Sequence, residues 1–161
     1  MNTDRIVRTA GRGDVEDLTA LIVGFRKFLG RDGPTDEDIR ASMIAQLRNS
    51  DVLVLLAYRG DTPVGYAFAL LRYSHWANGI EATVNDLFVL ESERGTGTGR
   101  ELIAQTVAIV KSRGCRLVTL STNEMNIASN RIYESLGFNC FSNLWRGKQV
   151  YYRLALPETD A

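Results

Sequence analysis

Three alternating glycines between two arginines form the most informative segment of this chain, Arg94-Gly95-Thr96-Gly97-Thr98-Gly99-Arg100. An apolar, strand-like run precedes the segment at 82–90, and apolar residues at helical spacing follow it at 102–110. Glycines let a ligand approach the backbone closely, and the free N–H groups in the first turn of a helix bind phosphate well. Because Arg94 and Arg100 add positive charge, the segment predicts a phosphate or pyrophosphate site rather than a plain turn.

Two better-known phosphate loops do not match this segment. A Walker A loop ends in Gly-Lys-Ser/Thr, and a dinucleotide-binding fingerprint has glycine where Arg100 stands. The segment therefore represents another type of phosphate-binding glycine loop.

The flanking segments predict a mixed α/β fold. A strand, a helix and a second strand in succession normally form a right-handed crossover between parallel strands, so we expect the centre of the sheet to be at least locally parallel. Hydrophobic spacing, caps and turn residues predict helices over 14–29, 35–47, 102–110 and 127–136, and strands over 6–7, 52–59, 64–73, 82–90, 116–121, 138–145 and 149–156.

Composition limits the class of protein. The chain has 161 residues, of which 45% are hydrophobic and 24% charged, and this suits one domain over 1–161 with a core from 5–156 and a loose tail at 157–161. Lys and Arg number 19, as do Asp and Glu, so the formal net charge is zero. Nucleic-acid-binding domains usually carry a basic excess, so we expect no nucleic-acid partner.

The sequence also predicts neither a membrane anchor nor a metal site. The apolar run 52–58 is far too short to span a bilayer, and residues 1–10 lack the apolar core of a signal peptide. The single histidine, His75, and the scattered Cys115 and Cys140 do not have zinc-site spacing. Two reduced thiols and no leader predict a cytoplasmic protein.

A second motif follows the glycine loop by about thirty residues. It consists of Asn126 and then Tyr133-Glu134-x-Leu136-Gly137-Phe138. With Arg94-x-x-Gly97-x-Gly99 it resembles the GNAT superfamily of acetyl-CoA-dependent N-acyltransferases. The resemblance covers 6–156 in topology and 82–138 in specific motifs. It implies one mixed sheet of about seven strands, splayed near its middle and flanked by about four helices, with acetyl-CoA in the opening and no metal.

The resemblance also implies which residues hold the cofactor. A backbone N–H of the strand before the loop would polarise the thioester carbonyl, the loop would bind the pyrophosphate, and the second motif would contact the pantetheine. By position these are Phe88 or Val89, then Arg94, Gly95, Thr96, Gly97, Thr98, Gly99 and Arg100, and then Asn126, Ser129 and Tyr133. Asn126 can also serve as a helix cap, and the two roles are compatible.

Acetyl transfer to an amine needs a base for the amine and an acid for the departing thiolate. By resemblance Tyr133 is the acid, although a helix can also bury such a ring in a core. Spermidine-type relatives carry Glu-Asp where this chain has Asn85-Asp86, and an amide cannot accept a proton at neutral pH. Asp86 and Glu81 are the alternative bases, with water as a third route. Neighbouring strand residues point to opposite faces, so Asn85 and Asp86 can share a face only through a bulge.

Short segments point to small primary amines as acceptors. Residues 73–76 and 85–89 are similar to the spermidine/spermine acetyltransferase branch, and 120–123 to aminoalkylphosphonate acetyltransferases. Within 73–76, Tyr73 and Trp76 are candidates to line an acceptor pocket or to cover the end of the sheet. His75 is either a proton relay near the acceptor or an ordinary exposed loop histidine. The acids at 36–38 favour a helix start and could also attract a cationic substrate.

Two other functions remain open at this stage. The first is a peptide or protein N-acetyltransferase. The second is an acyl-CoA-binding module without catalysis, which Asn85 favours because it replaces a glutamate. The resemblance further implies a homodimer through the terminal strands.

Overall fold

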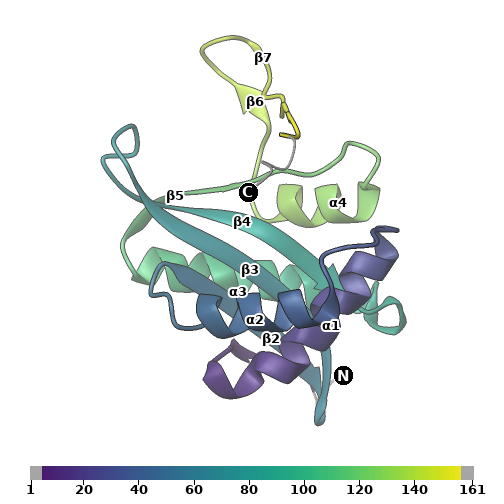
Figure 1. The fold of residues 1–161 in the computed structure, drawn as a ribbon. Helices are drawn as coiled ribbons and strands as arrows, with labels where there is room; N and C mark the ends of the chain where they lie inside the picture. Colours follow the sequence, from purple (N-terminus) through teal and green to yellow (C-terminus); the bar gives the residue numbers. More distant parts are fainter. Residues whose placement is uncertain (1–4, 157–161) are drawn as a thin grey trace.

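The computed structural model describes residues 5–156, and the tail predicted for 157–161 lies outside them. The elements follow one another in an α/β order (Figure 1). They are β1 (Arg5–Thr9), the short 3-10 helix η1 (Arg12–Asp14), α1 (Val15–Phe28), α2 (Asp36–Gln46), β2 (Val52–Arg59), β3 (Thr62–Ser74), β4 (Gly79–Val89), the short 3-10 helix η2 (Glu91–Glu93), α3 (Thr98–Ser112), β5 (Cys115–Leu120), α4 (Ile127–Ser135), β6 (Phe141–Ser142) and β7 (Gly147–Lys148).

Five strands form the main sheet in the order β1-β2-β3-β4-β5. The pairs β1-β2, β2-β3 and β3-β4 are antiparallel, while β4 and β5 are parallel and joined through α3, which confirms the predicted crossover. Because β5 is the last strand in this order, the parallel pair lies at one edge of the five-stranded sheet and not at its centre, where the sequence predicts it. Helices cover both faces, with α1 and α2 in front of the sheet and α3 behind it in Figure 1.

Two apolar cores lie on the two faces because side chains alternate along each strand. On one face, α1 and α2 pack against Tyr66, Phe68 and Phe88. On the other face, α3 and Tyr133 of α4 pack against Ala67, Ala69 and residues of the neighbouring strands. A side chain on β4 therefore belongs either to the α1 side or to the α3 side, and this distinction organises the site.

The sheet opens between β4 and β5. Their pairing runs from Ile80 beside Cys115 to Val84 beside Leu120. There β5 ends, while β4 continues to Val89 still paired with β3. Beyond Val84, none of the strands described within 5–156 pairs with β4 on its β5 side. The sheet therefore opens as the resemblance implies, but between its last two strands and not near its middle.

A bulge in β4 lies where this opening begins. Phe68 on β3 is opposite Asp86, and the next residue, Ala69, is opposite Val84, so Asn85 is the extra residue. A bulge of this kind bends the strand and redirects side chains.

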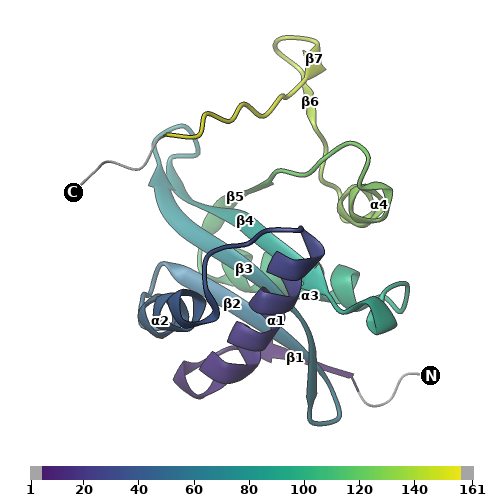
Figure 2. The ribbon, with the colours of Figure 1, turned by 45° about the vertical axis from the view of Figure 1, so that its right-hand side comes forward.

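The C-terminal strands differ from the prediction of a single seven-stranded sheet. β6 and β7 form a separate two-stranded sheet, and the expected long hairpin of 138–145 with 149–156 is wrong, because only two residues on each side pair. This hairpin stands away from the main sheet in both views (Figure 2). A two-stranded hairpin without a packed face is marginal in water, which explains why the pairing ends after two residues.

Among residues 5–156, no helix has both the length and the apolar character that crossing a membrane requires.

Candidate functional site

The β4 bulge brings Asn85 and Asp86 to the same face of the sheet. Asp86 lies opposite Phe68 on the α1 side, and Asn85 is an exposed extra residue beside it. The hydroxyl of Tyr66 donates to the Asp86 carboxylate at 3.3 Å. Burial raises the pKa of Asp86, while the Tyr66 hydroxyl and the charge of Arg31 oppose that rise. A half-buried carboxyl with a raised pKa, beside an opening in the sheet, has the properties of a general base.

Tyr133 lies on the opposite face from Asp86. It is 8% exposed within the α3-side core, and its ring meets Phe138 edge-on with centroids 6.0 Å apart. Burial raises the pKa of the Tyr133 hydroxyl, and a hydrogen bond with Ser129 opposes the rise. The phenol therefore keeps its proton at neutral pH and can donate it. Both interpretations of Tyr133 remain compatible with the structure, because the ring is part of the core while the hydroxyl is polar.

The glycine loop turns the chain from β4 into α3. Gly95 has φ +75° and Gly97 has φ +91°, a left-handed conformation that residues with a Cβ adopt only at a cost. Gly97 caps α3 without any side-chain acceptor, so the first N–H groups of the helix remain available to a ligand. Thr96 and Thr98 join their hydroxyls at 2.9 Å, and Arg5 of β1 donates to the Thr96 carbonyl at 2.9 Å.

The two arginines of the loop have different surroundings. Arg94 donates to the Val89 carbonyl at 3.1 Å and lies 4.5 Å from the centroid of the Phe28 ring. Arg100 donates to the Ser135 hydroxyl at 3.3 Å, which connects α3 to α4. Both side chains are exposed overall, so both keep donors for an anion.

Helices α3 and α4 approach each other beside this loop. A Cβ on Gly99 would lie 3.2 Å from Cδ1 of Ile132, so glycine allows the close approach. Asn126 caps α4 by accepting from the Ser129 N–H at 3.4 Å, which confirms the cap role. The start of α3 therefore lies beside α4, the helix that Asn126 caps and that carries Tyr133.

Glu81 lies apart from the bulge, near the tip of the β3–β4 hairpin. Its side chain is buried and its carboxylate pairs with Arg72 at 2.5 Å. It lines a cavity of about 690 Å³ together with Tyr73, His75 and Trp76. The structure thus separates the two carboxylates predicted as bases and gives Glu81 a partner of its own.

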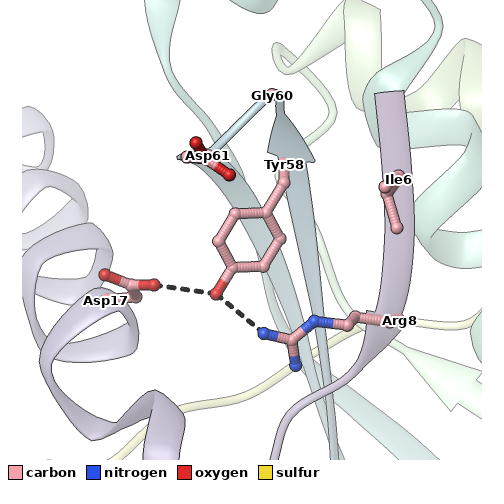
Figure 3. Close-up of a pocket in the computed structure, with 6 residues that line it drawn as sticks. All are labelled: Ile6, Arg8, Asp17, Tyr58, Gly60 and Asp61. Carbon is pink, nitrogen blue, oxygen red and sulfur yellow. Dashed lines mark hydrogen bonds between the residues drawn. The ribbon is translucent and has the colours of Figure 1, made fainter. Parts of the chain in front are cut away.

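A second cavity, of about 310 Å³, lies over β1 and β2 at the start of α1 (Figure 3). No motif in the sequence points to this cavity. Tyr58 donates to Asp17 at 2.8 Å and accepts from Arg8 at 3.2 Å, and Arg8 also binds Asp14 at 2.7 Å. The Arg8 hydrogen bond holds the pKa of Asp14 at about 2. Because these groups satisfy one another's hydrogen bonds, the network anchors α1 to the sheet and has a structural role.

The acids at the start of α2 serve the helix. Thr35 accepts from the Asp38 N–H at 3.1 Å and donates to its carboxylate at 2.6 Å, which forms a capping box. Asp36 pairs with Arg26 at 2.6 Å. Two of the three acids at 36–38 thus have structural partners, which favours the helix-start interpretation.

Comparison with known proteins identifies the family. The family model described as Acetyltransferase (GNAT) family matches residues 19–138. The chain belongs to the GNAT family of acetyltransferases. Membership of this family makes it an acyltransferase, and it has the mixed α/β fold that the family shares.

The names of GNAT proteins similar to this chain specify different acetyl acceptors. The chain is 38% identical over 86 residues to mycothiol acetyltransferase of Thermobispora bispora, a match that covers 52% of this chain but only 28% of that protein. It is 28% identical to aminoglycoside N(6')-acetyltransferase type 1 of Salmonella typhimurium, covering 71% of this chain and 81% of that one. It is also 28% identical to thialysine N-epsilon-acetyltransferase of Mus musculus, covering 83% and 81%. None of these three names mentions spermidine, spermine or an aminoalkylphosphonate, so the assignment to those branches stays a prediction.

Solved structures show the same GNAT fold. A protein from Arthrobacter sp. FB24 superimposes with a TM-score of 0.83 at 27% identity, covering 94% of this chain and 96% of that one. The aminoglycoside N-acetyltransferase AAC(6')-Iy in complex with CoA superimposes with a TM-score of 0.74 at 21% identity, covering 94% and 95%.

Proposed function

We propose that this protein transfers an acetyl group from acetyl-CoA directly to a primary amine of a small molecule. One observation carries the proposal. At the opening beside β4, a carboxyl of raised pKa, Asp86, lies on one face, and a protonated phenol, Tyr133, lies on the other. The glycine loop begins α3 at the end of the same strand. A thioester held in the opening would have a base on its acceptor side and an acid on its CoA side.

Each step of the reaction has a candidate group. An alkylamine resembling lysine has a pKa of about 10.4, so it is almost wholly protonated at neutral pH and needs a base. Asp86 takes that proton, with Asn85 positioning a water where the amine does not reach the carboxylate. The backbone N–H of Phe88 or Val89, on the part of β4 that extends beyond its pairing with β5, would stabilise the oxyanion. Tyr133 then donates its proton to the thiolate of CoA.

The loop has the donors that a pyrophosphate needs. The uncapped N-terminus of α3 offers backbone N–H groups and the positive end of the helix dipole. Arg94 and Arg100 add charge without being buried by other contacts. We assign the pyrophosphate to residues 94–100 and the pantetheine to Asn126, Ser129 and Tyr133.

Release of the CoA thiol from acetyl-CoA tests the proposal, with polyamines, aminoglycosides, amino acids and short peptides as acceptors. Acceptor-dependent release from small amines supports it. A large preference in kcat/KM for peptides would instead indicate a peptide or protein N-acetyltransferase. Tight acetyl-CoA binding without release from any acceptor would favour the acyl-CoA-binding module, the alternative that Asn85 supports.

We also propose a cytoplasmic homodimer. Cys115 and Cys140 are free thiols, which suits a reducing compartment. The supporting observation for the dimer is the segment after β7, residues 149–156. Its exposed fractions reach 87% at Tyr152 and 83% at Leu154, and among the strands described within 5–156 only β4 pairs with β5. An apolar segment and an unpaired strand edge favour association through the C-terminal strand.

A further inference from the structure

The cavity beside Glu81 has the size of a small-molecule subsite and lies on the acceptor side of the sheet. Its volume of about 690 Å³ falls within the range of ligand pockets. Along β4, Glu81 and Thr83 point to the same face as Asp86. The residues opposite them on β3 all lie on that face, because the extra residue of the bulge shifts the alternation of β4 side chains by one position. The cavity and the proposed base are therefore two parts of one surface.

The charges in this cavity do not cancel. Among the described residues that line it, Glu81 carries the only carboxylate, and Arg72 neutralises that carboxylate at 2.5 Å. Arg116 also lines the cavity, and within 5–156 it has neither a hydrogen bond nor an ion pair. Its side chain lies against Gly79, where a Cβ would be 3.0 Å from Cδ of Arg116. One unpaired guanidinium is thus left facing the cavity.

The walls of the cavity suit an aliphatic or planar spacer. Tyr73 is 68% exposed and Trp76 is 90% exposed, which leaves large apolar surfaces in contact with solvent. His75 lies against Trp76 with ring centroids 4.9 Å apart. Exposed aromatic rings beside a charged group are typical of surfaces that bind amphipathic ligands.

We propose that this cavity binds an anionic group of the acceptor, a carboxylate or a phosphonate, through Arg116. The inference rests on the proposed function and names its substrate class. A guanidinium binds both anions by paired, charge-assisted hydrogen bonds. Glu81 and Asp86 are opposite Arg72 and Phe68, which are four positions apart on β3, so the amine and the anion lie about 10–15 Å apart at the rise of an extended strand. The acceptor is an elongated amine with a negative far end, and polycationic amines bind less well.

Matched acceptors and a matched variant test this subsite. The probes are 8-aminooctanoate, its uncharged amide and 8-aminooctylphosphonate. The variant is Arg116→Gln, and Arg113→Gln is the control because it makes the same charge change outside the cavity. Calorimetry measures binding of each probe, and kcat/KM measures its acetylation. We expect the wild type and the control to prefer the acids over the amide by about tenfold or more, and Arg116→Gln to bring that ratio close to one.

The two measurements separate this inference from the proposed function. Equal binding of acid and amide, or a preference that survives Arg116→Gln, would overturn the anionic subsite even if both probes are acetylated. Selective binding of the acids without acetylation of any amine would retain the subsite and contradict the transferase. A preference for one anion over the other would decide between carboxylate and phosphonate.

Discussion

Asp86 combines two properties that oppose each other, burial and ionisation. Burial raises its pKa, so the folded protein holds this proton more tightly than the unfolded chain does. As pH rises from the ordinary pKa toward the raised one, the unfolded chain ionises before the folded protein does, so the folded state loses stability. The folded carboxyl ionises, and the base gains activity, as pH passes the raised pKa. Function and folding therefore respond to pH in opposite directions at this residue.

Asp86→Asn should separate these effects. We expect kcat/KM to fall about a hundredfold, because a general base contributes on the order of 10²–10⁴ in rate. The wild-type rate should fall as pH drops through the raised pKa, and the variant should lose that limb of its pH profile. Its thermal stability at neutral pH should equal or exceed that of wild type, since no buried charge forms. Asn85→Asp is the informative companion, because it puts a second carboxyl on the same face. A wild-type rate in Asp86→Asn would assign the base elsewhere.

Tyr133→Phe removes one oxygen atom and leaves the ring in the core. We expect kcat to fall about a hundredfold because the thiolate would leave without a proton. The dissociation constant for acetyl-CoA should change little, and the loss of the Ser129 hydrogen bond should cost about 1 kcal/mol of stability. Stopped-flow turnover together with calorimetric binding measures both quantities. An unchanged kcat would leave Tyr133 as a core aromatic only.

At the residue scale, sequence identified the participants but not their geometry. Tyr133, Asp86 and Glu81 were all identified as candidates, yet the bulge that turns Asp86 to the α1 side depends on the register between β4 and β3. That register is set by packing across the sheet, which no local pattern in 82–90 records. The Arg72 partner of Glu81 likewise comes from the adjacent strand.

At the scale of elements, the left-handed backbone conformation in the 94–100 loop predicts that acetyl-CoA binding requires glycine there. Gly97 has φ +91°, and an L-residue pays about 1–2 kcal/mol in the left-handed region. We expect Gly97→Ala to weaken acetyl-CoA binding about tenfold by turning the first N–H groups of α3 away from the ligand. The measurement is the dissociation constant from calorimetry. Gly13→Ala is the control, because its Cβ would meet nothing within 4 Å and its φ is not positive. Equal affinities in the two variants would contradict a role for the loop backbone.

Most elements could be predicted because their signals are local. The helix expected from Asp14 to Leu29 is α1, and the helix expected from Thr35 has the capping box that its sequence encodes. The prediction of a long C-terminal hairpin is wrong because its signal is not local. Residues 149–156 alternate like a strand, but a strand also needs a partner, and none of the strands described within 5–156 provides one.

For the whole molecule, the unpartnered C-terminal segment makes the homodimer testable. Tyr152 and Leu154 are almost fully exposed, so Tyr152→Asp with Leu154→Asp should change the stability of an isolated chain by no more than about 0.5 kcal/mol each. If the segment joins two copies, the wild type should have twice the chain mass of 17.9 kDa by light scattering, and the double variant should have that mass once. Met125→Asp, which changes a residue 78% exposed outside the segment, should remain dimeric. A wild-type mass of one chain at every concentration would contradict the dimer, and a double variant that stays dimeric would move the interface away from 149–156.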